Sequence, residues 1–115
     1  MKIRFLIFAL ALFSYTFVSG QNKHQDLYKI AESHTEKMAV DLNLTENQRE
    51  LIQRQNMIWL DQQVRYEKLE TKTAEQKQYM ENLKQDYIKN VTNTLTDDQR
   101  ASFKTSLSKT KFLKY

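Results

Sequence analysis

The chain has 115 residues, with no Cys, no Pro and a single Gly. This length allows one domain at most, and the missing Cys excludes disulfides and cysteine nucleophiles. Outside the first twenty residues the chain has 16 basic and 14 acidic residues, a net charge of +2, which argues against nucleic acid as a partner.

The first twenty residues have the composition of a secretory signal peptide. Lys2 and Arg4 give a positive start, and an apolar run extends from Phe5 to Val18. The run is shorter than the roughly 20 residues that a membrane-spanning helix needs. We therefore predict a signal peptide over residues 1–20, cleaved after Gly20, with a membrane anchor as the alternative.

The rest of the chain, residues 21–115, is predicted to be a single all-α domain. It is rich in Gln, Lys, Glu and Leu, which favour helix, and it lacks the Gly and Pro that tight turns use. Apolar residues recur at three- and four-residue spacing from Asp26 to Leu42, which predicts a first helix with one apolar face. Asn43 follows where a left-handed residue ends a helix, and Asn is the usual choice there when Gly is absent.

One short pattern, Leu-Thr-x-x-Gln-Arg, occurs at residues 44–49 and again at 95–100. In each copy the Thr hydroxyl is expected to accept from the Gln backbone N–H, while the Gln side chain reaches back to the Thr N–H. This arrangement is a capping box, so helices are predicted to begin after Thr45 and Thr96. The pattern positions are Leu44, Thr45, Gln48, Leu95, Thr96 and Gln99.

The second helix is expected to be long, from Thr45 to about Glu70. Its apolar residues fall on two stripes. We expect the larger stripe to face the rest of the chain and the smaller one to contact a client protein or a second copy. The alternative is a helix in the middle of a small bundle, covered on both sides by its own chain. The larger stripe is Leu51, Ile52, Ile58, Trp59, Tyr66 and Leu69. The smaller is Met57, Leu60 and Val64.

A third capping box, formed by Thr73 and Gln76, predicts a third helix that ends near Asn93. The helix after Thr96 is a weaker fourth one, whose apolar residues continue to Leu113. Its C-terminal half is basic, and we expect this end to fray in solution. Association of this basic end with a membrane surface is a further alternative, which predicts strong salt dependence.

The residues do not favour an enzyme, and we predict no catalytic residues and no cofactor. Without Gly in this region a Gly-rich phosphate loop is excluded, and the acidic residues are scattered over helix faces. A metal site is the sharper alternative. His34 and Met38 are four residues apart on the first helix, and Asp41 lies three residues further along the same side. This imidazole, thioether and carboxylate form a mixed set that selects no particular metal.

An exported helical chain with two Leu-Thr-x-x-Gln motifs about fifty residues apart resembles the Spy/CpxP family of periplasmic stress proteins. The match is closest at residues 41–48 and 95–103. The segment between the motifs is shorter than in the best-known members, and Asp97 stands where the family often has Pro. The resemblance implies a long bent helical hairpin with short flanking helices, about four helices in all. It also implies an antiparallel homodimer shaped like a shallow cradle.

The resemblance further implies a function, because members of this family hold partly unfolded proteins without ATP. We therefore expect an ATP-independent, chaperone-like periplasmic protein that binds unfolded or misfolded envelope proteins under envelope stress. The alternative is a regulator of the same family that responds to metal or modulates a membrane sensor kinase. In either case the six motif residues are expected to be structural, fixing helix starts and bringing the two ends of the hairpin together.

Overall fold

The computed structural model describes residues 26–113, and this part of the chain is built from four α-helices. The predicted all-α class is therefore confirmed. The helices are the first helix over residues 26–42, α2 over Glu46–Glu67, α3 over Ala74–Thr94 and α4 over Asp97–Leu107.

The predicted signal peptide lies outside the described residues. Within residues 26–113, no helix combines the length and the apolar character needed to cross a bilayer.

All three predicted capping boxes are present at the starts of α2, α3 and α4. At α2, the Gln48 backbone N–H donates to Thr45 Oγ1 at 3.2 Å, and the Thr45 N–H donates to Gln48 Oε1 at 2.9 Å. The expected left-handed residue is also confirmed, since Asn43 has a φ of 54°. Each of these three helices therefore begins where its local sequence satisfies the first free N–H groups.

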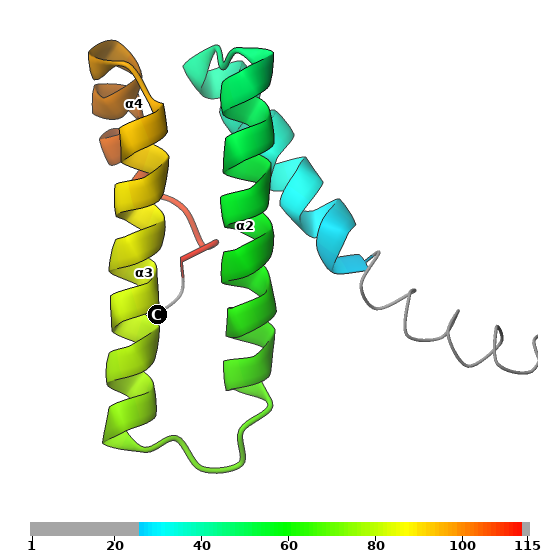
Figure 1. The fold of residues 1–115 in the computed structure, drawn as a ribbon, viewed down its shortest axis with the longest axis vertical. Coiled ribbons are helices and arrows are strands. Elements are labelled where there is room, and N and C mark those ends of the chain that lie inside the picture. The colour runs from blue at the N-terminus through cyan, green and yellow to red at the C-terminus, as the bar shows by residue number, and fades with distance from the viewer. Residues whose placement is uncertain (1–25, 114–115) are drawn as a thin grey trace, which may run out of the picture.

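Helices α2 and α3 form the predicted long hairpin and lie side by side along most of their length (Figure 1). Residues at seven-residue spacing on each helix face the partner, because seven residues are close to two helical turns. On α2 these core residues are Ile52, Trp59 and Tyr66. On α3 the buried residues are Met80 and Tyr87, seven residues apart, and Val91, four residues further along the same side.

The first helix and α4 lie beside the end of the hairpin where the two Leu-Thr motifs meet, and the loop end of the hairpin extends past both (Figure 1). Met38 and Leu42 of the first helix, and Phe103 of α4, join the hairpin residues in one core cluster. The short helices thus cover one part of the hairpin and leave other parts of its surface exposed.

The structure divides the larger predicted stripe of α2. Its seven-residue series is buried, but Leu51 is 40% exposed and Ile58 is 55% exposed. Each of these two residues precedes a core residue by one position, which turns its side chain by about 100° around the helix. Leu69, 36% exposed, lies beyond the end of α2. The prediction that the whole stripe faces the chain was wrong for these three residues.

The smaller predicted stripe is also corrected. Leu60 is only 8% exposed, and Met57 and Val64 are half-buried. The reason is that the first helix packs along this side of α2, where Asn56, one turn before Leu60, is hydrogen-bonded to Thr35. The alternative, a helix covered on two sides by its own chain, is therefore the arrangement observed.

The fourth helix is shorter than predicted, because it ends at Leu107 with Ser108 as its C-cap. The following segment, residues 108–113, folds back onto the bundle. The backbone carbonyl of Phe112 accepts a hydrogen bond from the Trp59 indole N–H at 2.8 Å. The basic end is thus seated on the core in this structure, where we expected it to fray.

Candidate functional site

The two Leu-Thr motifs meet through their glutamines at one end of the bundle. Gln48 Nε2 donates to Gln99 Oε1 at 2.8 Å, and Gln99 Nε2 donates to Gln48 Oε1 at 3.1 Å. Each amide also reaches the end of the helix that precedes the other motif. Gln48 donates to the Thr94 carbonyl at 3.0 Å, and Gln99 donates to the Leu42 carbonyl at 3.1 Å. We call this pair of amides the glutamine junction.

The glutamine junction joins four helix ends with neutral groups. Its amides satisfy carbonyls that the ends of the first helix and α3 leave without an intrahelical partner. Leu95 is buried in the core cluster below it, and Leu44 packs against the same cluster. The structure therefore brings all six predicted motif residues together. Because amides neither titrate nor act as nucleophiles, the arrangement joins helices and offers no reactive group.

The three candidate metal residues line one cavity of about 210 Å³ between the first helix, α3, α4 and the C-terminal segment. The His34 ring is stacked on Phe112, with centroids 3.9 Å apart and planes 7° apart. Burial, and to a lesser extent the charge of Lys37, lowers the pKa of His34 from 6.5 to about 4. Met38 is 7% exposed, and its Sδ lies 3.9 Å from Asn56 Nδ2.

These contacts do not form a ready metal site. The imidazole face is covered by a phenyl ring, and the thioether is turned into the core. Residues 26–113 hold no group of three His, Cys, Asp or Glu side chains arranged to bind a metal ion. The cavity is lined by aromatic and aliphatic side chains with Lys37, Asp41 and Lys109 also in its wall, a composition that suits an organic ligand better than an ion.

A buried polar cluster crosses the middle of the bundle, and the sequence reading missed it. Asn56 is 0% exposed and joins three helices. Its Nδ2 donates to Thr35 Oγ1 of the first helix at 2.7 Å, and its Oδ1 accepts from the Tyr87 hydroxyl of α3. Burial raises the pKa of Tyr87 above its usual range, so this hydroxyl stays a donor. The sequence did contain an indication of this cluster, because Asn56 and Gln63 are polar residues at seven-residue spacing on the buried side of α2.

An aromatic group around the C-terminal segment was also missed. The ring of Phe112 lies 6.1 Å from that of Tyr87, and Tyr87 lies 6.2 Å from Trp59, both at tilted angles. Together with the His34 stack, these contacts surround Phe112 with three aromatic residues. No local motif could have indicated this group, because Trp59 and Phe112 are 53 residues apart.

The hairpin also carries a partly apolar surface that its own chain leaves exposed. Ile58 of α2 and Leu83 of α3 line one groove, with a volume of about 230 Å³. Leu51 is seven residues before Ile58 and Tyr79 is four before Leu83, so each pair shares a helix side. Tyr79 is 55% exposed. We call Leu51, Ile58, Tyr79 and Leu83 the open face.

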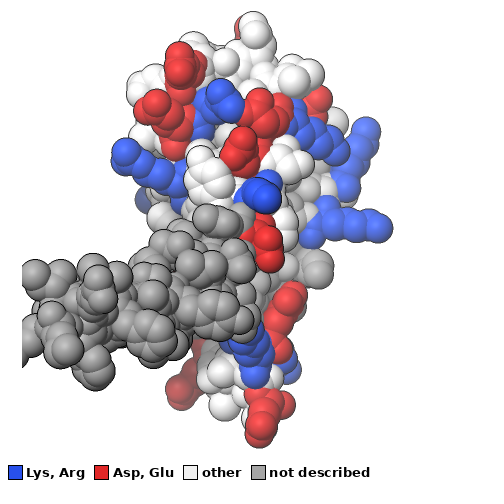
Figure 2. Space-filling model, turned by 90° about the vertical axis from the view of Figure 1, so that its right-hand side faces the viewer, with Lys and Arg blue, Asp and Glu red and all other residues white. Residues whose placement is uncertain are grey.

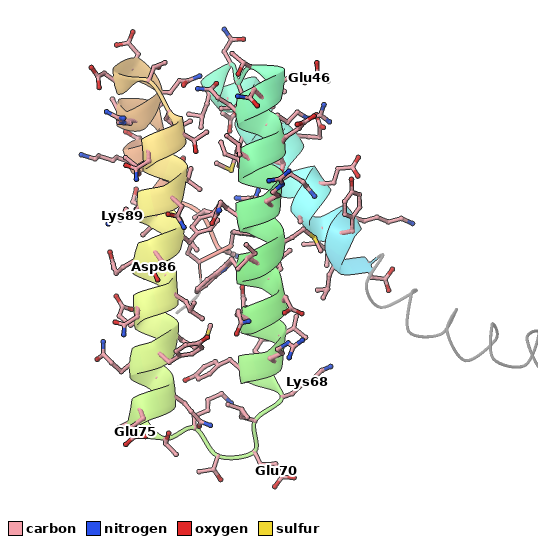
Figure 3. The ribbon with its side chains drawn as sticks, viewed as in Figure 1. Glu46, Lys68, Glu70, Glu75, Asp86 and Lys89 are labelled. Atoms are coloured by element: carbon pink, nitrogen blue, oxygen red, sulfur yellow. The ribbon has the colours of Figure 1, made fainter. Side chains whose placement is uncertain are left out.

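Charged and polar residues border the open face. Gln55, Asp86 and Asn90 share the groove with Ile58. Figure 3 shows Asp86 on α3, with Lys68, Glu70 and Glu75 at the loop end of the hairpin. On the side of the molecule seen in Figure 2, Lys and Arg side chains are interspersed with Asp and Glu. This mixture gives the visible described part of that side no extended patch of one charge.

Comparisons with known proteins find no match to this chain among family models, curated proteins or solved structures.

Proposed function

We propose that the protein binds exposed apolar segments of unfolded or misfolded proteins without ATP, as a chaperone-like protein of the bacterial periplasm. The proposal places the chain with the Spy/CpxP proteins that its two Leu-Thr-x-x-Gln motifs resemble. The observation that carries it is the open face of the hairpin.

The open face has the composition that transient binding of unfolded chains needs. Ile58 and Tyr79 are each 55% exposed, although Ile is among the most often buried residue types and Tyr is commonly buried in part. Covering them with an apolar client segment gains about 25 cal/mol for each Å² of apolar surface removed from water. Asp86 and Asn90 in the same groove keep the surface hydrated between binding events. Binding of this kind needs no nucleotide.

A second copy of the chain could share this surface. The resemblance implies an antiparallel homodimer, and apolar residues on one side of a hairpin suit either a twin or a client. We propose that dimerisation leaves part of the open face accessible to clients. Analytical ultracentrifugation of the purified protein measures the oligomeric state directly.

The first prediction concerns aggregation. The protein is added to a thermally unfolding client without ATP, and light scattering is followed over a range of molar ratios. We expect suppression at near-stoichiometric amounts. The Ile58→Ser variant should need several-fold more protein for the same effect, because it removes an exposed apolar side chain without touching the core.

Val40→Ser is the matched control. Val40 is 80% exposed on the first helix, away from the groove, so this variant also replaces an exposed β-branched residue by Ser. It should suppress aggregation like the unmodified protein. Equal loss in both variants would show that general surface hydrophobicity is involved, and not the open face. No suppression at large excess would overturn the chaperone proposal. Retention of one single envelope protein in a capture experiment would then favour the sensor-regulator alternative.

A further inference from the structure

Phe112 occupies a defined seat on the bundle, formed by His34, Tyr87 and Trp59. The phenyl ring stacks on the imidazole with centroids 3.9 Å apart, and it meets the Tyr87 ring at 6.1 Å with a 48° tilt. Trp59, 2% exposed, donates its indole N–H to the Phe112 carbonyl at 2.8 Å. We call these three residues the aromatic seat.

The aromatic seat recognises two features of one residue. It contacts the ring of Phe112, and it binds the main-chain carbonyl of that same residue. Every aromatic residue in a polypeptide carries this ring and carbonyl at nearly the same spacing. In folded proteins such residues are mostly buried, whereas unfolded chains expose them. A site with this geometry therefore distinguishes unfolded from folded proteins.

The segment that fills the aromatic seat contacts the other helices mainly through Phe112, near its C-terminal end. Residues 108–113 follow the C-terminus of α4 and are not helical. Their local hydrogen bonds are short in sequence range, such as Lys109 N–H to Ser106 O at 3.0 Å and Phe112 N–H to Thr110 Oγ1 at 3.2 Å. Phe112 itself is only partly buried, and Lys111 beside it is exposed. Segments with these properties open locally at low free-energy cost.

A cavity beside the C-terminal segment leaves room for another chain to take the place of Phe112. Phe112 and Leu113 form one wall of the cavity of about 210 Å³, whose other walls come from the first helix, α3 and α4. Met38, Phe103 and Leu107 give these walls an apolar character. Withdrawal of residues 111–113 would join this cavity to the aromatic seat. The seat would then be large enough for a Tyr or Phe with its neighbouring residues.

We propose that the aromatic seat is a second binding site, which takes one aromatic residue of an unfolded polypeptide, and that Phe112 occupies it in cis until a client replaces it. The proposal rests on the proposed function, since it assigns a side-chain preference to chaperone-like binding. It adds a site that adjoins the open face, because Trp59 and Tyr87 also line the groove that contains Ile58. It also makes the C-terminal segment a competitor of the client.

The test uses the only Trp of the chain as its reporter. The Phe112→Ala variant of the whole chain is compared with the unmodified protein. Each is titrated with a Trp-free octapeptide of Ser, Lys and a single central Phe, and the emission of Trp59 is followed. We expect the variant to bind this peptide at least about tenfold more tightly than the unmodified protein, because it no longer has to displace its own Phe ring.

Two controls make the result specific. The same octapeptide with Ala in place of Phe should leave the Trp59 emission unchanged in both proteins. The Lys111→Ala variant alters the exposed neighbour of Phe112 and should bind like the unmodified protein. Equal affinity in all three proteins, or an equal response to the Ala peptide, would overturn the proposal.

Further measurements distinguish failure of the aromatic-seat proposal from misfolding of the variant and from failure of the proposed function. Circular dichroism reports whether Phe112→Ala keeps its helices. If the variant loses its helices, the unmodified protein is titrated to high peptide concentration instead. It should show a saturable Trp59 response to the Phe peptide and none to the Ala peptide. Absence of this difference would overturn the proposal. Because Trp59 also lines the groove that contains Ile58, the tenfold gain from Phe112→Ala should persist when Ile58→Ser is combined with it. Loss of this gain would place the peptide in the groove and overturn the proposal. Suppression of aggregation without any Trp59 response would contradict the seat alone, and peptide binding without suppression would contradict the proposed function alone.

Discussion

Two polar clusters join helices that are far apart in the sequence, and they differ in how deeply they are buried. The glutamine junction lies at the end of the bundle, where Gln48 and Gln99 are half-buried. The Asn56 cluster lies in the middle, where Asn56 is 0% exposed and Thr35 is 1% exposed. Both connect segments of the chain through side-chain amides, but they differ in burial and in how far the local sequence already positions the amide.

The two clusters show that an amide positioned by its neighbours in sequence loses less conformational freedom on folding than one positioned only by helix packing. Each glutamine of the junction is already positioned by its own capping box, so the cross-bonds need little further ordering. Asn56 gains its partners only when three helices assemble. Once assembled, it is shielded from water, and a partner left without its hydrogen bond cannot be satisfied by solvent.

Removing the buried amide should therefore have the largest effect. We expect Asn56→Ala to lower the free energy of unfolding by about 3 kcal/mol, because the hydroxyl of Tyr87 loses its acceptor, Thr35 loses a donor, and a small cavity forms. Urea denaturation followed by circular dichroism measures this loss. Asn82→Ala is the matched control, since Asn82 is exposed on α3 and should cost about 0.5 kcal/mol or less. Equal losses in the two variants would show that burial does not set the cost.

The same contrast explains what the sequence could predict. The helix starts and the left-handed Asn43 follow from residues within four positions of one another, and the structure confirms them. For Gln48 and Gln99, the sequence predicted only that their motifs bring the two ends of the hairpin together. Its cross-bonds depend on where the helices end in space.

The contacts of the helix sides were predicted less well, for a geometric reason. One residue turns a helix by about 100°, so Ile58 and Trp59 lie on adjacent sides although they are neighbours in sequence. Assigning both to one stripe placed Ile58 in the core and left Leu60 for a client, and the observed exposures of 55% and 8% reverse this. The aromatic seat could not be predicted at all, because the Lys-rich composition around Phe112 is typical of a solvated end.

Acid should lower the stability of the bundle through His34, because the amides of both clusters do not titrate whereas His34 does. His34 borders the same cavity as Tyr87, and its pKa falls from 6.5 to about 4 on folding. Between these values the unfolded chain binds the proton and the folded chain does not. Stability is therefore fully present above pH 6.5 and is lost as the pH falls toward 4.

The expected loss between pH 7 and pH 5 is about 1 to 2 kcal/mol, after allowing for partial solvent screening. Urea denaturation at the two pH values measures it. His34→Phe keeps a ring against Phe112 but cannot bind a proton, so this variant should lose less stability over the same interval. Lys37, Asp41 and Lys109 line the same cavity and remain in both proteins, so their contributions cancel. An unchanged pH dependence in His34→Phe would contradict the assignment to His34.

The smallest effect should come from the bond between the two glutamines of the junction, and a third capping box in the same chain provides the control. Gln76 caps α3 with the same pair of hydrogen bonds that Gln48 and Gln99 make to their own threonines. Gln76→Ala should therefore cost the capping contribution alone, about 0.5 to 1 kcal/mol. Gln48→Ala and Gln99→Ala should each cost more, because carbonyls at the ends of the first helix and α3 also lose a donor.

A double-mutant cycle isolates the bond between the two glutamines from these losses. The double variant Gln48→Ala with Gln99→Ala should be more stable than the sum of the single losses indicates, by about 1 kcal/mol, because either substitution alone already breaks the mutual pair. A cycle of Gln48→Ala with Gln76→Ala should be additive, since these residues lie at opposite ends of the hairpin. Additivity in both cycles would mean that the two motifs act as separate helix caps, and that the bundle is closed at this end by the packing of Leu44 and Leu95 instead.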